Sequence, residues 1–434
     1  MLVSSWFACG GSVALPDEAP SVRIDDSGPV AVVDPPKNLL MISVDTLRVE
    51  DLPTFGGSAV TPELDAFLED AEIWLDHQAC SNWTYSALTC VMSGSWPAEI
   101  GFVPQAWEDQ MGEVPDEVVL GSELLQAAGF ATRLVTTSPF LADNTLLDSG
   151  FDEVTDLVTA GHVVTADSVT DGALAAIEGL PADQPWYVHA HYIDPHQGYV
   201  PPDAYLEGLD ELDELPWDLT VPWSNEQIVE AWPTLSDEAR ELVRAHLDVR
   251  YQGELAYVSA EVGRLLDSAP LDDALVVIWS DHGEELLEHG QLGHQLHLYE
   301  ESTRALVALR WAGGEPVRHT DRTSHQQIWP TVLDLLEVDR STMLGQHRDE
   351  APELRFAQKL SEDGSAAMVE DGTHKLVVYD HGGAELYDLQ ADPDELHDLL
   401  AEDAGTAARL WTELGPFVQE LDAMSLADFE DPGL

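Results

Sequence analysis

The sequence contains few basic residues. Lys and Arg number 18 against 82 Asp and Glu in 434 residues, which gives a formal charge of -64, and only Lys37, Lys359 and Lys375 are lysines. A surface this negative repels phosphate groups, so the composition argues against nucleic acid and against an anionic membrane as partners. The acid is spread along the whole chain. Since salt screens self-repulsion, this pattern is typical of solvation in a saline habitat.

Long apolar runs and cysteines are scarce as well. No stretch reaches the roughly 18 apolar residues of a membrane helix, so no transmembrane segment is predicted. Cys9, Cys80 and Cys90 are too few for a disulfide framework. Cys80 could pair with Cys90 in an oxidising compartment, but we favour two buried thiols that pack in the core. With 44% hydrophobic residues, the chain is globular and long enough for one large domain with an appendage, or for two domains.

The first 37 residues differ from the rest. A short apolar run ends in small residues at Cys9 but lacks the positive start of an export signal. One interpretation is a lipidated anchor at Cys9 on an exported, periplasmic or cell-surface lipoprotein, and the other is a ragged terminus. We expect export rather than a cytoplasmic location. Residues 10–37, rich in Pro, Asp and Ser, are predicted to be a linker.

From residue 38 onward, apolar strands alternate with amphipathic helices, which predicts an α/β fold with a largely parallel sheet. Functional residues gather at the carboxyl ends of such strands, where Asp45, Asp194 and Asp281 are expected. Residues 204–248 mix acid with tryptophan and are predicted to be a loop-like insertion bordering the site. Turn signals after residue 366 predict a small antiparallel sheet with a final helix. The predicted domains are 38–340 and a C-terminal subdomain, 341–434.

Four segments carry residues suited to chemistry. Asp281 and His282 follow an apolar strand and could hold a metal, although a helix cap with a surface histidine is the alternative. Thr84 lies where a helix is predicted to begin, as a nucleophile beside that metal or as an ordinary cap. Two histidine clusters could supply ligands or proton donors. They contain His189, His191 and His196 in the first, and His289, His294 and His297 in the second.

Taken in order, these segments resemble the sulfatase-type hydrolases of the alkaline phosphatase superfamily. The likeness runs from about Asn38 to Leu400 and is carried by seven segments in the family's order. They are ISVDTLR, SNWTYSALTCVMSGSWP, HYIDPHQGYVPP, GELAYVSAEVGRLL, SDHGEELLEHGQLGHQLHLYEE, PTVLDLL and ELYDLQADPDELHDL. The resemblance implies an alkaline phosphatase-like α/β/α sandwich with a small C-terminal antiparallel β subdomain.

Carried over residue by residue, the resemblance gives roles to the candidate site residues. It makes Thr84 the nucleophile, counted back from Ser93 and Gly94, which occupy the family's Thr-Gly positions. His196 and His294 would contact the anionic group or protonate the leaving oxygen, with His191 close behind. The implied metal ligands are Asp45, Thr84, Asp281 and His282, and a second ion would be held by Asp194, His196 and His294.

This chain departs from the sulfatase pattern at four points. Thr84 stands where sulfatases oxidise Cys or Ser to formylglycine, so no formylglycine is expected. The Pro-Ser-Arg that follows is replaced, starting at Ser86. Thr46 replaces a second aspartate, and His282 replaces an Asn, which shifts the expected ion from Ca toward Mn or Zn. The departures resemble the superfamily's threonine-using phosphoryl and phosphonyl transferases.

The sequence therefore predicts a metal-dependent hydrolase of small sulfate, phosphate or phosphonate esters. A rival within enzymes is a two-metal phosphodiesterase or phosphonate hydrolase. A rival of another class is a catalytically inactive, metal-stabilised binding module, in which the departures at the nucleophile reflect lost chemistry.

Overall fold

The computed structural model describes most of the chain after its first 34 residues, and Pro35–Leu434 form one compact unit. Cys9, with its predicted lipid anchor, and most of the predicted linker lie outside the described residues. The described ranges are 35–97, 99–101, 114–115, 117–142, 146–158, 165–221, 224–294, 297–343, 352–359, 365–379 and 382–419.

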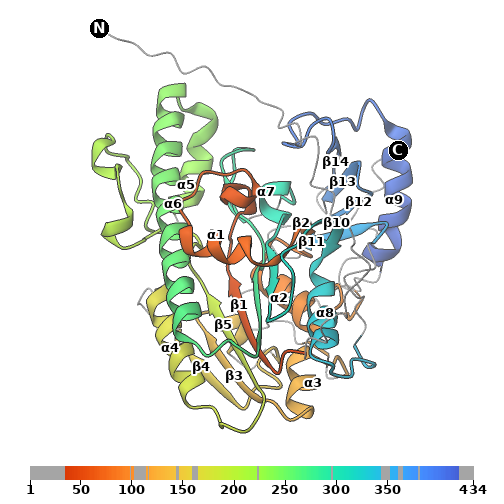
Figure 1. The fold of residues 1–434 in the computed structure, drawn as a ribbon. Helices are drawn as coiled ribbons and strands as arrows, with labels where there is room; N and C mark the ends of the chain where they lie inside the picture. The colour runs from red at the N-terminus through yellow and green to blue at the C-terminus, as the bar shows by residue number, and fades with distance from the viewer. Residues whose placement is uncertain are drawn as a thin grey trace, which may run out of the picture. The chain divides into compact units, whose positions relative to one another are not determined.

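A sheet of eight strands forms the centre of this unit, in the order β10-β2-β9-β6-β1-β5-β3-β4 (Figure 1). All neighbouring pairs are parallel except those of β9, which runs antiparallel to both β2 and β6. The strands are β1 (Asn38–Val44), β2 (Glu72–Gln78), β3 (Ala131–Thr136), β4 (Glu153–Asp156), β5 (Trp186–Tyr192), β6 (Ala274–Ser280), β9 (Val307–Arg310) and β10 (Arg318–Ser324).

Helices cover both faces of the sheet because the central strands are apolar on both sides. In β1, Leu40 and Ile42 join one buried cluster, while Leu39 and Met41 join the other. Figure 1 shows α4 and α6 on one side and α3 and α8 on the other. The α/β/α sandwich is confirmed. One layer holds α1 (Pro62–Glu69), α4 (Ala166–Glu178) and α6 (Asp237–Ser268), and the other α2 (Thr84–Ser93), α3 (Gly121–Ala127) and α8 (Ile328–Leu335).

The segment predicted as a loop-like insertion is partly helical. It holds α5 (Ser224–Ala231) and the first turns of α6, which begins at Asp237. The side chain of Ser236 caps α6 by accepting a hydrogen bond from the backbone N–H of Ala239 at 3.3 Å. Acidic residues in its first turn suit the positive end of the helix dipole. In this part of α6, Val243, Leu247 and Tyr251 are buried at a spacing of four residues. That spacing is the period of a helix, and the prediction missed it.

The C-terminal part forms the predicted small antiparallel sheet, in the order β11-β12-β13-β14. The final helix α9 packs against β12 and β13 over a small apolar cluster. The backbone N–H of Gln358 donates to the carbonyl of Cys80 at 2.9 Å, so β11 lies beside the segment that precedes α2. The remaining elements are β7 (Glu285–Leu286), β8 (Leu292–Gly293), α7 (Glu300–Thr303), β11 (Arg355–Lys359), β12 (Ala366–Glu370), β13 (His374–Tyr379), β14 (Ala384–Asp388) and α9 (Ala404–Gln419).

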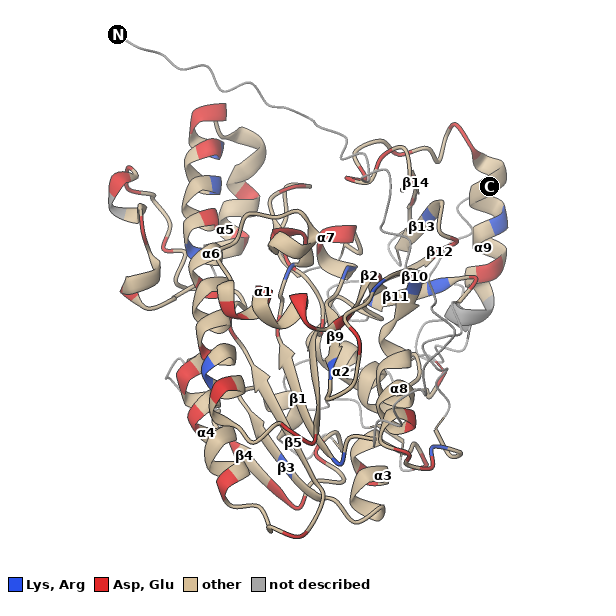
Figure 2. Cartoon of the chain, viewed as in Figure 1, with Lys and Arg blue, Asp and Glu red and all other residues tan. Residues whose placement is uncertain are grey.

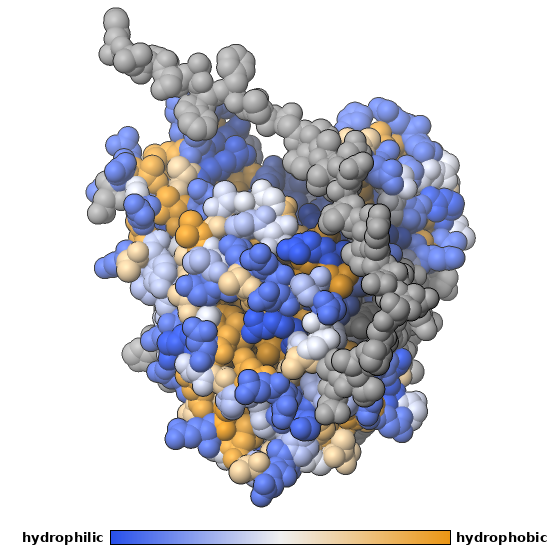
Figure 3. Space-filling view, in the orientation of Figure 1, coloured by the Kyte–Doolittle hydropathy of each residue, from blue (hydrophilic) through white to orange (hydrophobic). Residues whose placement is uncertain are grey.

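The acidic residues lie along the helices and loops, with few basic residues among them (Figure 2). Hydrophilic residues occupy much of the face shown in Figure 3, with smaller apolar areas between them. In the part of the chain that is described, we find no helix that combines the length and the apolar character needed to cross a membrane.

Candidate active site

Three neighbouring strands deliver the predicted site residues to one edge of the sheet. Asp45 follows β1, and Asp281 with His282 follows β6, whose last residue Ser280 pairs in register with Val44. On the other side of β1, strand β5 leads to Asp194 and His196. The carboxyl ends of parallel strands therefore bring together residues that are more than 200 positions apart in the sequence.

Asp45, Asp281 and His282 form a compact group of possible metal ligands. One ligand atom from each of the three lies within 4.8 Å of the others, and all three residues are buried. His282 Nε2 is 3.9 Å from Asp45 Oδ1 and 3.6 Å from Asp281 Oδ2. Ligands about 2 to 2.5 Å from a common ion have such separations. The three side chains converge as the sequence predicts.

The hydrogen bonds around this group leave its ligand atoms available. His282 Nδ1 is 2.8 Å from the carbonyl of Gly283, which only accepts, so Nδ1 carries the proton and Nε2 presents its lone pair. Asp281 Oδ1 accepts from the backbone N–H groups of Thr46 and His282. Among the described residues, Asp45 Oδ1 and Asp281 Oδ2 have no hydrogen-bond partner. Two buried carboxylate oxygens and an imidazole nitrogen fit a divalent cation.

The electrostatics of the site also favour a cation. Burial raises the pKa of Asp45 well above its usual value, and Asp281 and Glu284 raise it further. Burial likewise raises the pKa of Asp281 and brings that of Glu284 to about 7. Arg48 approaches the backbone carbonyl of Glu284, but its charge pairs with Glu50, Asp51 and Glu288. A bound divalent cation would therefore offset a local excess of buried negative charge.

Thr84 is the first residue of α2 and faces the same point. Its hydroxyl Oγ1 lies 3.5 Å from Asp45 Oδ2 and 3.4 Å from His282 Nε2, and the residue is 3% exposed. The helix begins there as predicted, but the Thr84 hydroxyl is directed to the site. The capping position is Trp83, which makes no side-chain cap hydrogen bond.

The predicted pair of free thiols is wrong. Cys80 and Cys90 form a disulfide that joins the segment before α2 to the last turn of that helix. The sequence could not decide whether the two cysteines pair. Side chains 10 residues apart meet only if α2 folds back toward the segment that precedes it. The bond encloses Thr84, so it ties the ends of the segment that carries the candidate nucleophile.

His196 and His294 lie together beside the metal group. Their ring centroids are 4.9 Å apart, and the His294 ring is 4.8 Å from that of His282. Burial and, to a smaller extent, the neighbouring His294 lower the pKa of His196 to about 3. His294 Nδ1 lies 2.9 Å from Glu284 Oε1. That His196 and His294 contact the anionic group or protonate the leaving oxygen stays a prediction.

Asp194 is not grouped with these two histidines. It lies instead beside Glu254 of α6, and the two buried carboxyl groups interact with each other, so that the pKa of Glu254 is raised to about 9 by burial and by Asp194. Within the described residues, three ligand atoms are brought within metal reach at Asp45, Asp281 and His282, and this group does not include Asp194. The second ion on Asp194, His196 and His294 stays a prediction.

The structure adds residues that the sequence did not single out. Lys359 of β11 lies with its ammonium 5.0 Å from the centre of the Trp83 ring, beside Thr84. Its charge also helps to lower the pKa of His294, after burial and His282. Lys359 thus brings a positive charge from the C-terminal sheet to the neighbourhood of Trp83 and His294. In the sequence, Lys359 could have been singled out because it is one of only three lysines.

Part of the predicted insertion lies near the histidines. Helix α5 contacts β8, which immediately precedes His294. Asn225 Nδ2 of α5 donates to Gln197 Oε1, next to His196, at 2.8 Å. That this segment sets substrate preference stays a prediction.

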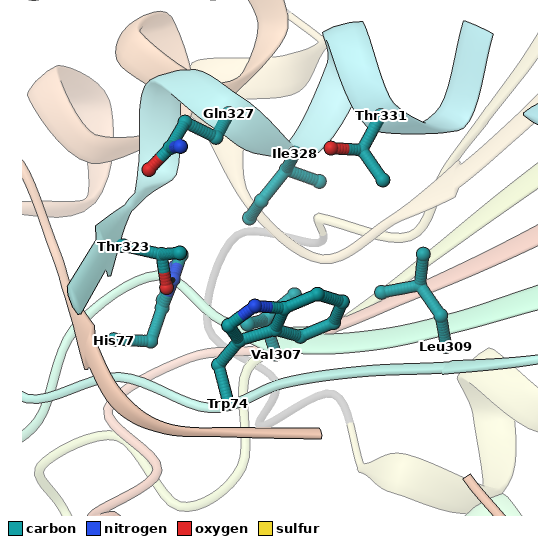
Figure 4. Close-up of a pocket in the computed structure, with 8 residues that line it drawn as sticks. All are labelled: Trp74, His77, Val307, Leu309, Thr323, Gln327, Ile328 and Thr331. Carbon is teal, nitrogen blue, oxygen red and sulfur yellow. Dashed lines mark hydrogen bonds between the residues drawn. The ribbon is translucent and has the colours of Figure 1, made fainter. Parts of the chain in front are cut away.

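A small cavity beside the sheet is distinct from this group (Figure 4). It has a free volume of about 20 Å³, room for about one water molecule. The ring of His77 in its wall is tilted against that of His325, with the centroids 5.3 Å apart. His325 Nε2 lies 3.1 Å from the carbonyl of Ser280. The cavity is too small for an ester substrate. Its walls are formed by Trp74, His77, Val307, Leu309, Thr323, Gln327, Ile328 and Thr331.

A family model described as Sulfatase matches residues 37–338. The chain belongs to the sulfatase family. The choline-sulfatase of Rhizobium meliloti (strain 1021) is 23% identical over an alignment that covers 85% of this chain and 83% of that protein. The family assignment makes this chain a sulfuric or phosphoric ester hydrolase, in accord with the resemblance of its segments.

Solved structures share the fold. BT4656 in complex with its substrate D-glucosamine-2-N,6-O-disulfate has a TM-score of 0.73 and 18% identity, covering 92% of this chain and 99% of that one. The phosphonate monoester hydrolase SpPMH from Silicibacter pomeroyi has a TM-score of 0.68 and 19% identity, covering 90% and 97%. The same fold is thus found in proteins described by sulfur and by phosphorus chemistry.

Proposed function

We propose that this sulfatase-family hydrolase is metal-dependent and uses Thr84 as its nucleophile. The observation that carries the proposal is the position of the Thr84 hydroxyl, within 3.5 Å of both Asp45 and His282 at the start of α2. A hydroxyl there has the positive end of the helix dipole beside it, which favours an alkoxide and an anionic substrate.

Asp45, Asp281, His282 and Thr84 would hold the ion, with Mn, Zn and Ca as candidates. When bound, it would supply positive charge that stabilises the Thr84 alkoxide and the anionic group of the substrate. Every other task falls to the chain's own residues.

Thr84 Oγ1 attacks sulfur or phosphorus in line, and the bond to the leaving alcohol breaks. His196 or His294 assists the leaving oxygen, and water then cleaves the threonine ester. Lys359 adds positive charge near the anion. A threonine has no route to the formylglycine aldehyde, so hydrolysis passes through this ester.

The substrate we propose is a small anionic ester of sulfate, phosphate or phosphonate. The relatives named above include both a choline-sulfatase and a phosphonate monoester hydrolase, and Thr84 suits attack at phosphorus. With 82 acidic residues against 18 basic ones, the chain would repel a polyanionic polymer more strongly than a small ester. A phosphonate hydrolase is therefore the second candidate.

We also propose that the protein works outside the cytosol. The disulfide between Cys80 and Cys90 supports this, because such bonds persist mainly in oxidising compartments.

A panel of chromogenic aryl sulfates, phosphates and phosphonates, each assayed with added Mn, Zn and Ca, tests the function. We expect hydrolysis of at least one ester to depend on a metal. With metal in excess, Thr84→Val should lower turnover by roughly 1,000-fold or more, while the fold and the other ligands, Asp45, Asp281 and His282, are kept. The matched control is Thr89→Val, which removes another buried hydroxyl of α2, one that only bonds the carbonyl of Tyr85. Equal activity of Thr84→Val and the parent would exclude the mechanism, and no turnover of any ester would favour the inactive binding module.

A further inference from the structure

A chain of three side chains runs from the candidate site into the core. Ser43 of β1 lies between two histidines of the neighbouring strand β5, with its Oγ 2.9 Å from His189 Nε2 and 2.8 Å from His191 Nδ1. The register pairs Ser43 directly with His191, and His189 projects to the same side because strand side chains alternate. All three residues are 0% exposed.

These two hydrogen bonds restrict where the protons lie. Ser43 Oγ has one hydrogen, so it can donate to only one histidine and must accept from the other. Both rings are fully buried, and a buried imidazolium is costly, so both rings are taken to be neutral. Two arrangements remain. Either His189 Nε2–H donates to Ser43, which donates to His191 Nδ1, or every bond points the other way.

The two ends of the chain favour the first arrangement. At the outer end, His191 Nε2 has no hydrogen-bond partner in the described part of the chain and lies 3.8 Å from Asp45 Oδ2. A proton on Nε2 would face this carboxylate with an attractive N–H, whereas a lone pair would be repelled. At the inner end, His189 Nδ1 has no hydrogen-bond partner among the residues that the structure describes. The His189 ring lies 6.3 Å from that of Tyr187 and 6.2 Å from that of Trp279. An N–H buried there would lack an acceptor.

We propose that Ser43 and His189 are positioning residues that hold His191 in its Nε2–H tautomer. His191 then acts as a hydrogen-bond donor toward Asp45 and toward an anionic group bound beside it, and it is neither a base nor a metal ligand. This role rests on the proposed function for its use in turnover, but the tautomer itself is a property of the protein without substrate. Partners of this kind orient the carboxylates and imidazoles of metal sites.

Long-range ¹H–¹⁵N correlation spectra of ¹⁵N-histidine-labelled full chain test the proposal, with the His191 signals assigned by their loss in His191→Phe. We expect the parent protein to show His191 protonated at Nε2 and not at Nδ1. Ser43→Ala and His189→Phe should each populate the Nδ1–H form. Ser43→Thr should keep the parent tautomer, and so should His189→Gln, whose amide places an N–H near the Nε2 position.

The matched control is Ser259→Ala, which removes a buried hydroxyl that contacts Glu63 and the backbone of Leu64 in another part of the chain. It should leave the His191 signals unchanged. With the best ester, Ser43→Ala and His189→Phe should lower turnover about 10- to 100-fold, with rescue by Ser43→Thr and His189→Gln. A parent spectrum with His191 protonated at Nδ1 would overturn the proposal, as would a parent tautomer kept in both disrupting variants. If no ester is hydrolysed, the proposed function fails while the spectra still decide the tautomer.

Discussion

At the carboxyl ends of β1 and β6, Asp45 and Asp281 are buried beside histidines but without a Lys or Arg partner among the described residues. At the contact between α7 and the C-terminal sheet, Glu300 and Glu395 instead lie on a buried lysine. Lys375 Nζ lies 3.1 Å from Glu300 and 2.9 Å from Glu395. Burial alone would lower the pKa of Lys375, but the two carboxylates raise it to about 12. Buried negative charge is thus neutralised by a lysine at the C-terminal contact, but no lysine neutralises it at the strand ends.

The difference separates a structural group from a functional one. A buried carboxylate without a partner is costly, so it persists where something else supplies the positive charge or where the function needs it. In a chain with only three lysines, placing one wholly inside the C-terminal contact marks that contact as structural. Leaving the strand ends open is what a metal site requires.

The variant Lys375→Met tests whether the buried lysine stabilises the C-terminal contact, because it leaves Glu300 and Glu395 buried without their cation. We expect a loss of about 3 to 5 kcal/mol in the free energy of unfolding, the usual result of removing one partner from a buried ion pair. Chemical denaturation of parent and variant at pH 7 measures it. The control, Lys37→Met, removes an exposed ion pair with Asp273 and should change little. A small loss for Lys375→Met would show that the contact is not held by this charge.

The segment that carries Thr84 is held by a covalent bond, whereas the C-terminal contact is held by ion pairs. Replacing Cys80 and Cys90 together with alanine removes the disulfide, whose loop spans 10 residues. We expect stability to fall by roughly 2 to 3 kcal/mol, because the unfolded chain gains freedom. Thermal unfolding with and without a reducing agent checks this. The reducing agent should destabilise the parent and leave the double variant unaffected.

At the strand ends, Asp281→Asn should raise the free energy of unfolding, whereas Lys375→Met should lower it. The amide oxygen can still accept from the backbone N–H groups of Thr46 and His282, while the new NH₂ replaces the unpartnered Oδ2. Without metal, we expect the variant to gain about 1 to 3 kcal/mol, because a buried charge without a partner is removed. It should also lose its bound metal, which elemental analysis measures. Loss of stability in the metal-free variant would mean that the Asp281 charge is already compensated.

Much of this architecture follows from local sequence. Apolar runs ending in Asp45 and Asp281 predicted two strand ends, and the parallel sheet brought them together. A helix starting at Thr84 was also predictable. Contacts that depend on where distant elements meet were not. The disulfide depends on α2 folding back on the segment before it. Asp194 lies beside Glu254 of the distant helix α6. Lys359 lies near the site because β11 lies beside Cys80. Periodicity contains no information on such pairings.

The smallest expected effect is on the pH dependence of stability, to which histidines in the two regions contribute in opposite directions. His289 Nδ1 lies 2.7 Å from Glu301 Oε1 at the C-terminal contact. Although burial opposes it, the bond to Glu301 raises the pKa of His289 to about 9. The folded protein therefore binds this proton more tightly than the unfolded chain, whose histidines titrate near 6.5. Its stabilisation is complete below about pH 6.5 and is lost as the pH rises through 9.

At the strand ends, His196 has a pKa of about 3 because it is buried, so its proton binds more tightly to the unfolded chain and stability falls as the pH drops below about 6.5. We therefore expect His289→Gln to be less stable than the parent at pH 6, with a difference that shrinks toward zero by about pH 10. Melting temperatures measured at several pH values from 6 to 10 test this. Glu301→Gln should show the same convergence, since it removes the partner of the same proton. A difference between parent and His289→Gln that stays constant with pH would mean that His289 contributes packing against Tyr299, its stacked neighbour at 3.8 Å, and no charge.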